Sequence, residues 1–178
     1  QEVLDAQREE SLAFFGFSPQ RITLLVSGGS RGARSLNRAM AEVYPTLVHY
    51  PDLQIIHLTG AIDYEDTLRA IAEKKIDLKS YPQIIVRPYL DEMQYGLGAA
   101  DFCVCRAGAT FLAELTACGL PGILIPYPYA AENHQEYNAK ALVYQNAATM
   151  ILDKELTGEK LSQNILDLYQ NKDKRISM

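Results

Sequence analysis

Residues 21–34 read RITLLVSGGSRGAR, and this stretch indicates the class of fold. Its first half, residues 21–27, is a short and nearly continuous apolar run, as expected of a strand buried on both faces. A glycine-rich turn follows, and the residues from Ser35 onward have the pattern of a helix. A buried strand, a tight turn and a helix in this order begin a βαβ unit of a parallel sheet.

The rest of the chain repeats this alternation of strand and helix. It therefore predicts an α/β fold: one Rossmann-like, doubly wound parallel sheet in a single domain that spans residues 1–178. The polar tail, residues 171–178, is expected to be frayed. Further strands are predicted at residues 54–59, 83–87, 102–105, 122–126 and 148–152, and helices at residues 1–15, 35–49, 64–75, 91–100, 110–118, 135–145 and 161–169.

Composition excludes several classes of protein. Of the 178 residues, 48% are hydrophobic and 22% charged, which is normal for a globular domain. The formal net charge of −5 argues against a nucleic-acid partner, and no apolar run approaches the roughly 20 residues that span a bilayer. The three cysteines, Cys103, Cys105 and Cys118, are expected to be unpaired, with Cys103 and Cys105 on opposite faces of their strand.

Ligands of such sheets bind at the carboxyl ends of the strands, so the loops there are the places to inspect. The first loop holds Gly28, Gly29, Ser30 and Gly32 before a helix. Glycines allow close approach of the backbone, and a helix start offers N–H groups to an anion. The loop has neither the GxGxxG spacing nor a Walker A lysine. A tight turn without a ligand is the alternative interpretation.

Two further loops carry polar groups. Residues 106–110 (RAGAT) present another helix start, and Glu114 follows one turn later. A carboxylate there could accept hydrogen bonds from a vicinal diol, or could simply favour the helix dipole. Residues 126–135 (PYPYAAENHQ) lead into a helix with His134, Gln135 and Asn138, which suit sugar hydroxyls. Helix capping by Asn133 is the alternative for this loop.

The three loops together describe a nucleotide-sugar site better than each does alone. The chain contains no Asp-x-Asp pair, so a metal held by such carboxylates is disfavoured. The charge of a diphosphate would then be met by helix dipoles and by basic side chains such as Arg106.

Four strings carry a resemblance to a known family: LLVSGGSRGARSLN, RPYLDEM, AADFCVCRAGATFLAELTACGLPGILIPYP and NHQEYNA. In order and spacing they resemble the C-terminal domain of the MurG family, and the resemblance covers essentially the whole chain. These bacterial proteins are GT-B glycosyltransferases, in which two Rossmann-like domains face each other across a cleft. The chain is thus expected to be one half of a GT-B enzyme, the domain that binds the donor UDP-N-acetylglucosamine (UDP-GlcNAc).

The resemblance also implies roles for particular residues. Ser30 and the glycine loop would contact the diphosphate, and Glu114 the ribose hydroxyls. Leu90 and Met93 would form the uracil pocket, and His134 and Gln135 would contact the sugar. The implied donor-binding residues are Gly28, Gly29, Ser30, Gly32, Leu90, Met93, Arg106, Gly108, Ala109, Thr110, Phe111, Glu114, His134, Gln135 and Asn138.

By the same resemblance the whole protein transfers N-acetylglucosamine (GlcNAc) to lipid I, undecaprenyl-pyrophosphoryl-MurNAc-pentapeptide, and forms lipid II for peptidoglycan. It would act without a metal or other cofactor, as a peripheral protein on the cytoplasmic face of the bacterial plasma membrane. The acceptor site and the catalytic base would lie in an N-terminal domain outside this chain, which alone would be inactive. Two alternatives remain: the donor-binding subunit of a two-chain GlcNAc transferase of dolichol-linked glycan synthesis, and a non-catalytic module that binds UDP-sugars.

Overall fold

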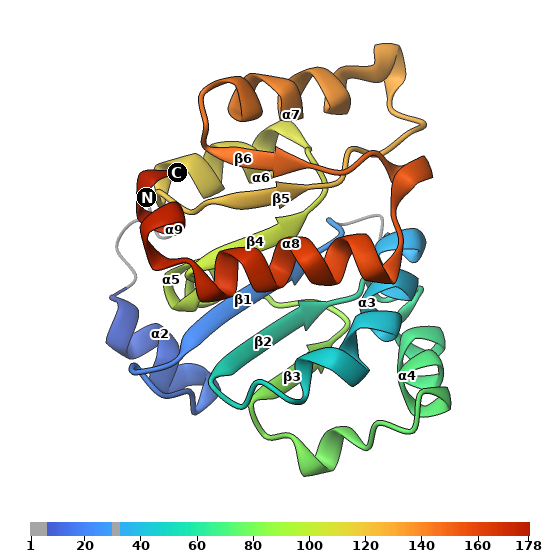
Figure 1. Cartoon of the computed structure of the whole chain (residues 1–178), viewed down its shortest axis with the longest axis vertical. Coiled ribbons are helices and arrows are strands. Elements are labelled where there is room, and N and C mark those ends of the chain that lie inside the picture. The colour runs from blue at the N-terminus through green and yellow to red at the C-terminus, as the bar shows by residue number, and fades with distance from the viewer. Residues whose placement is uncertain (1–6, 30–32) are drawn as a thin grey trace.

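The computed structural model describes residues 7–29 and 33–178, and its centre is a single parallel sheet. The strands have the order β3-β2-β1-β4-β5-β6, and all five neighbouring pairs are parallel. The carboxyl ends of the strands therefore share one edge (Figure 1). The strands are β1 (Ile22–Ser27), β2 (Leu53–Leu58), β3 (Ile84–Arg87), β4 (Phe102–Cys105), β5 (Gly122–Leu124) and β6 (Ala148–Met150).

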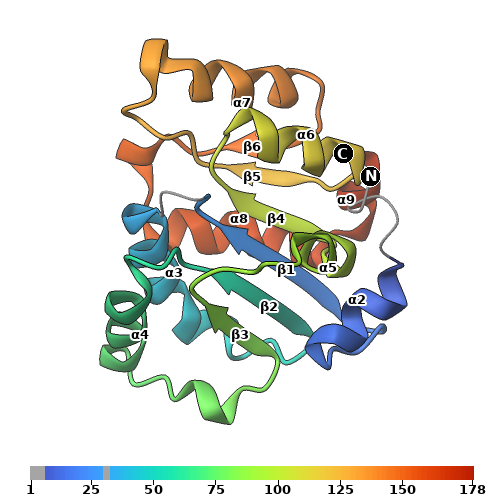
Figure 2. The same cartoon turned by 180° about the vertical axis from the view of Figure 1, so that it is seen from behind.

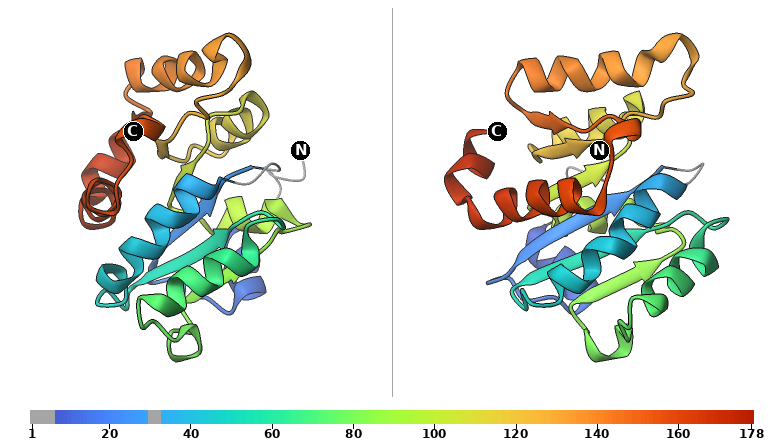
Figure 3. Two further views of the ribbon diagram at one scale, coloured as in Figure 1. Left: turned by 90° about the vertical axis from the view of Figure 1, so that its right-hand side faces the viewer. Right: turned by 45° about the vertical axis from the view of Figure 1, so that its right-hand side comes forward.

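Helices cover both faces of this sheet (Figure 3). One hydrophobic cluster joins the sheet to α3, α4 and α8, and a second joins it to α2, α5, α6 and α7. Figure 2 shows the molecule from the opposite side, which gives a clearer view of α2 and α5 of the second group. The α-helices are α2 (Arg8–Phe15), α3 (Arg34–Leu47), α4 (Tyr64–Glu73), α5 (Met93–Ala99), α6 (Ala109–Ala117), α7 (His134–Tyr144), α8 (Gly158–Gln170) and α9 (Lys172–Ser177); the 3-10 turns are η1 (Leu78–Ser80), η2 (Ala131–Asn133) and η3 (Asp153–Glu155).

The central strand β1 shows why its sequence is almost uninterrupted in apolar residues. Leu24 and Val26 belong to the first cluster, whereas Leu25 belongs to the second, and all three side chains are fully buried. Successive strand residues point to opposite faces, so a strand covered on both sides needs apolar residues at every position. The predicted doubly wound α/β sheet is confirmed.

The predicted elements are all present, with ends shifted by a few residues. The predicted strand at residues 102–105 coincides with β4, whereas the helix predicted at residues 1–15 begins only at Arg8, because Gln7 before it is extended. It ends at Gly16, whose φ of 68° places it in the left-handed conformation, and whose N–H donates to Ala13 O. This conformation is the reason that glycine commonly ends a helix.

Two expectations from the sequence are wrong. The tail is not frayed, because it forms α9: Asn171 caps that helix by accepting from Lys174 N, and the Arg175 guanidinium donates to the carbonyls of Leu168 and Tyr169. Cys103 and Cys105 do not lie on opposite faces, since residues two apart on a strand share a face. Both pack in the second cluster as free, buried thiols.

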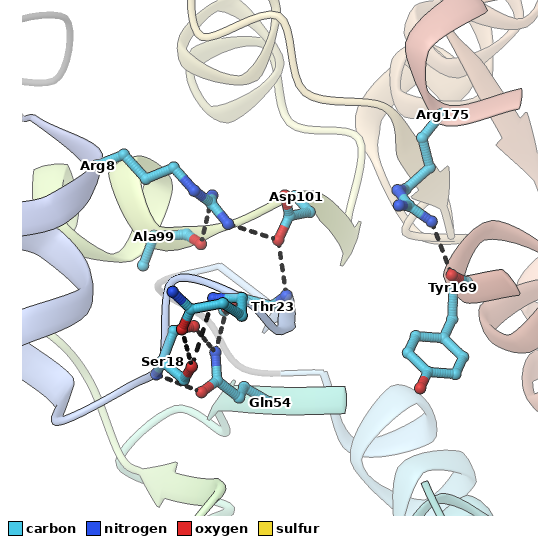
Figure 4. A network of polar contacts seen from close by, with 9 residues as sticks. Arg8, Ser18, Thr23, Gln54, Ala99, Asp101, Tyr169 and Arg175 are labelled. Atoms are coloured by element: carbon cyan, nitrogen blue, oxygen red, sulfur yellow. Dashed lines mark hydrogen bonds and ion pairs between the residues drawn. The ribbon is translucent and has the colours of Figure 1, made fainter. Parts of the chain in front are cut away.

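A polar network closes the amino-terminal edge of the sheet (Figure 4). Arg8 of α2 donates to Ala99 O at 3.2 Å and to Asp101 Oδ2 at 3.0 Å. The same carboxylate oxygen accepts from Thr23 N at 2.8 Å, so one aspartate joins α2, β1 and the start of β4. This edge lies opposite the carboxyl ends of the strands, where ligands of such folds bind.

None of the helices in the described ranges has both the length and the apolar character that a bilayer crossing requires.

Candidate functional site

A cavity of about 740 Å³ opens at the carboxyl edge of the sheet. It lies where the order of the strands reverses, because Gly28 and Gly29 follow β1, and Arg106 and Gly108 follow the neighbouring β4. Such a switch point is the usual ligand site of an open α/β sheet. The predicted site residues that line the cavity are Gly28, Gly29, Leu90, Met93, Arg106, Gly108, Ala109, Thr110, Phe111, Glu114 and Gln135.

The glycine loop forms one wall. Gly29 has a φ of 81°, a conformation that residues with a Cβ rarely adopt, which explains the glycine at this position. Gly28 is buried and Gly29 is exposed. Ser30 and Gly32, which were predicted to complete this loop, lie outside the described residues. Helix α3 begins just after it, and its N-cap residue, Ala33, makes no capping hydrogen bond from its side chain.

The amino end of α6 forms a second wall. Gly108 is the N-cap residue and has no side chain to cap the helix, and the first helical N–H bond runs from Leu112 to Gly108 O. The N–H groups of Ala109, Thr110 and Phe111 therefore have no partner within the helix. All three residues line the cavity, as does Glu114, which is half-buried on the same helix. The geometry brings amide donors and a carboxylate to one space.

The third wall is apolar. The buried Leu90 lies between β3 and α5, and Met93 is the first residue of α5. Both line the cavity together with Leu58, Pro88 and Tyr89. Helix α5 packs tightly here, since a Cβ on Gly96 would lie 3.0 Å from Leu90 Cδ2. An apolar slot beside backbone donors suits a flat ring with polar edges.

Arg106 was predicted to help meet the charge of a diphosphate, and in the structure its guanidinium also has protein partners. Its side chain is 9% exposed and forms an ion pair with Asp153, with Nη1 2.6 Å from Oδ1. Nη1 also donates to the carbonyls of Ile125 and Pro126, and Nη2 donates to Ser35 Oγ at 3.0 Å. The guanidinium carbon lies 5.6 Å from the centre of the Tyr127 ring. Within the described lining, Arg106 and Glu114 are the charged residues.

Gln135 and Asn138 of α7 hold the loop after β4 in place. Gln135 Oε1 accepts from Ala107 N at 3.2 Å and from Tyr127 N at 2.9 Å. Asn138 Nδ2 donates to Ala107 O at 3.1 Å, so α7 side chains bind both the backbone N–H and the backbone carbonyl of Ala107. Gln135 also lines the cavity, and its Nε2 lies near Gly108, where a Cβ would be 3.8 Å from that nitrogen. Asn138 is not among the lining residues.

His134 lies outside the cavity lining and is exposed. Its Nδ1 is 2.7 Å from Ala131 O. The alternative of helix capping by Asn133 is not observed: Asn133 occupies the N-cap position of α7, but its side chain donates to Glu136 Oε2 instead. Glu132 and Asn133 have φ values of 51° and 56°, so the chain turns sharply before α7 begins.

Sequence reasoning missed several residues of this site. Gly60 and Ala61 follow β2 and line the cavity, and Gly60 has a φ of 81° like Gly29. A glycine directly after a predicted strand was the available signal. Ser35 and Asp153, which bind Arg106, carried no signal, because Asp153 is 47 positions away in the chain.

No group of three or more His, Cys, Asp or Glu side chains is placed to hold a metal ion in residues 7–29 and 33–178.

A parallel α/β domain with a cavity at the switch point, bordered by two helix starts and a carboxylate, belongs to the nucleotide-binding class. Within this class the chain belongs to the glycosyltransferase family 28 C-terminal domain, whose family model matches residues 23–178.

Named relatives agree with this family. The chain is 50% identical over 177 residues to the UDP-N-acetylglucosamine–N-acetylmuramyl-(pentapeptide) pyrophosphoryl-undecaprenol N-acetylglucosamine transferase of Desulforamulus reducens, covering 99% of this chain and 48% of that protein. The protein of the same name from Moorella thermoacetica is 42% identical with the same coverage. The crystal structure of Acinetobacter baumannii MurG superposes with a TM-score of 0.77 at 28% identity, over 98% of this chain and 49% of that one. The chain thus spans about half the length of these relatives.

Proposed function

We propose that this chain is the donor-binding half of a GT-B glycosyltransferase and that its donor is UDP-GlcNAc. The observation that carries the proposal is the cavity itself: the amide-rich start of α6, the glycine turn after β1 and the carboxylate of Glu114 face one space of about 740 Å³. Ligand sites of drug-sized molecules occupy roughly 300–1,000 Å³, so a nucleotide fits. The names of the relatives supply the identity of the sugar.

Each wall has a part in this proposal. The base lies in the apolar slot of Leu90 and Met93, and the ribose hydroxyls donate to Glu114. The diphosphate accepts hydrogen bonds from the free amides of α6 and from the glycine loop, where the helix dipole favours negative charge. Gln135 Nε2 donates to the sugar, which extends toward α7 and reaches His134 at the exposed side of the helix.

In the whole protein, this half orients the donor and stabilises the leaving UDP, while another domain supplies the acceptor site and the base. The reaction is an inverting transfer of GlcNAc to the 4-hydroxyl of the MurNAc unit of lipid I, and it needs no metal. The protein acts as a peripheral protein at the cytoplasmic face of the plasma membrane. The lack of any Asp-x-Asp pair supports the metal-independent chemistry. Loss of the full-length activity in a chelator, with recovery on adding a divalent cation, would contradict it.

Calorimetry tests the donor half directly. The chain is titrated with UDP, UDP-GlcNAc and dTDP-glucose, and the expected result is binding of the two uridine ligands in preference to dTDP-glucose. Absence of binding by all three overturns the proposal and favours a non-catalytic domain.

A second assay tests whether the acceptor site and the base lie outside this chain. The chain alone is expected to give no turnover of a lipid I analogue, and the full-length protein is expected to turn it over. Turnover by this chain alone would show that acceptor site and base lie within it. An upstream Rossmann-like half in the same reading frame supports the single-chain bacterial enzyme, whereas its absence supports a two-chain transferase.

A further inference from the structure

The guanidinium group of Arg106 joins the loops after β4 and β5 to the start of α3. Arg106 belongs to the loop after β4, and its Nη1 binds the carbonyls of Ile125 and Pro126, where the loop after β5 begins. Its Nη2 binds Ser35 Oγ in the first turn of α3, which follows the glycine loop. The fourth partner is Asp153 in η3, the segment after β6.

Asp153 closes this network into a triangle. Its Oδ1 accepts from Arg106 Nη1 and from Ser35 Oγ, both at 2.6 Å, and the Ser35 oxygen in turn accepts from Arg106 Nη2. The side chains of Arg106 and Asp153 are 9% and 19% exposed. A buried guanidinium needs both a counter-charge and hydrogen-bond acceptors, and Asp153 supplies the counter-charge.

We propose that Asp153 is a positioning residue of the cavity: through Arg106 and Ser35 it fixes the loops after β4 and β5 relative to the start of α3. Asp153 itself does not line the cavity, whereas Arg106, Gly108 and Tyr127 do. The proposal concerns the arrangement of the loops, and it rests on the proposed function only where ligand affinity is the readout.

The physical reason is that the guanidinium of Arg106 would be buried without a counter-charge if Asp153 were removed. An uncompensated charge cannot remain buried, so the guanidinium would move toward water, and the cavity is the open side of its surroundings. The carbonyls of Ile125 and Pro126 would lose a donor at the same time, and Pro126 and Pro128 in this loop have no N–H of their own. The loops after β4 and β5 would then be held together chiefly by Gln135.

The test uses three variants and one matched control. Asp153→Ala removes charge and acceptor, Asp153→Asn keeps the acceptor oxygen, and Ser35→Ala removes the hydroxyl without leaving a buried charge. The control is Asp101→Ala, which breaks the ion pair with Arg8 at the opposite edge of the sheet (Figure 4). Hydrogen exchange of residues 106–111 and 125–129 is measured for each protein, together with the affinities for UDP and uridine.

Asp153→Ala is expected to speed exchange in these two segments while β1 and β2 stay protected. It should weaken UDP and uridine alike by about tenfold, equivalent to roughly 1.4 kcal/mol, because displaced loops affect the whole ligand. Asp153→Asn keeps an acceptor oxygen but not the counter-charge, so it should show an intermediate effect. Ser35→Ala should show a smaller effect of the same kind, and Asp101→Ala should leave both loops and both affinities unchanged.

Unchanged exchange and affinity in Asp153→Ala would overturn the proposal. So would tighter binding of UDP without a change for uridine, since Asp153 would then only suppress the charge of Arg106. If Asp153→Ala does not fold, Asp153→Asn and Ser35→Ala decide, and wild-type exchange in both would overturn the proposal. If the wild-type protein binds neither ligand, the proposed function fails, but the exchange data still test the role of Asp153.

Discussion

His57 lies at the centre of a polar chain inside the sheet and is fully buried. Its Nδ1 is 2.9 Å from the Tyr44 hydroxyl, and its Nε2 is 2.9 Å from Asn37 Oδ1. Because an amide oxygen only accepts, Nε2 carries the proton and Nδ1 accepts from the tyrosine. Asn37 Nδ2 then donates to Thr59 O, directly before Gly60 in the cavity wall. The neutral imidazole satisfies every partner, and burial lowers its pKa from 6.5 to about 3.

This pKa predicts how stability changes with pH. Because the folded state binds the proton less readily than the unfolded chain, the contribution of His57 to stability is complete above about pH 6.5 and is lost as the pH falls toward 3. At about pH 4.5 the loss is roughly 3 kcal/mol, since each pH unit below 6.5 costs about 1.4 kcal/mol. This is a large part of the roughly 5–15 kcal/mol that stabilises an ordinary domain.

The assay is urea unfolding at a series of pH values for the wild type and for His57→Gln, which keeps an amide donor and acceptor but does not titrate. The variant is expected to be less stable at neutral pH and to lose less free energy of unfolding between about pH 6.5 and 4.5, with a difference of roughly 3 kcal/mol from the wild type. His49→Gln, at an exposed histidine, is the matched control and should keep the wild-type pH dependence. Parallel pH profiles for the wild type and His57→Gln would refute this reasoning.

Three further predictions follow from particular contacts. Replacing Glu114 by Gln or Ala should weaken UDP binding by about 10- to 150-fold, which is equivalent to losing charge-assisted bonds worth about 1.5–3 kcal/mol, with little change in stability. Calorimetry should also show that the wild type discriminates against 2′-deoxy-UDP, whereas the Ala variant scarcely does. Glu73→Gln, at an exposed glutamate, is the control. Equal affinity of the wild type for the ribo and deoxy forms would remove Glu114 from the site. Gly158→Ala should destabilise the domain by about 1–3 kcal/mol in urea unfolding, because the new Cβ would lie 2.7 Å from Glu42 Cβ. A variant as stable as the wild type would contradict this, since α3 and α8 would then move apart without cost. Among the thiols, Cys118 should be alkylated first in the native protein, since it is half-buried whereas burial raises the pKa of Cys105 to about 12; faster modification of Cys103 or Cys105, measured by mass spectrometry, would contradict this order.

The sequence by itself determined the layers of this protein. A parallel strand covered by helices on both faces is mostly apolar along its length, and residues 22–27 and 53–58 carry that signal locally. Strand ends followed by glycine also mark the edge where a ligand can approach, so the sequence is enough to place Gly28, Gly29 and the start of α6 at the edge that holds the cavity.

Only the tertiary structure decided what the polar side chains of that edge do. Arg106 lines the cavity as predicted, and its guanidinium is also bound by Asp153 and Ser35, which come from distant parts of the chain. Asn138 was predicted in the site, but it binds a backbone carbonyl behind it. A hydrogen-bonding or charged group can satisfy several partners, and the choice among them depends on which segments the fold brings within about 3 Å. Apolar periodicity depends on residues that are neighbours in the chain, so it can be read from the sequence. The pairing of polar groups depends on which distant segments the fold brings together at the carboxyl edge of the sheet.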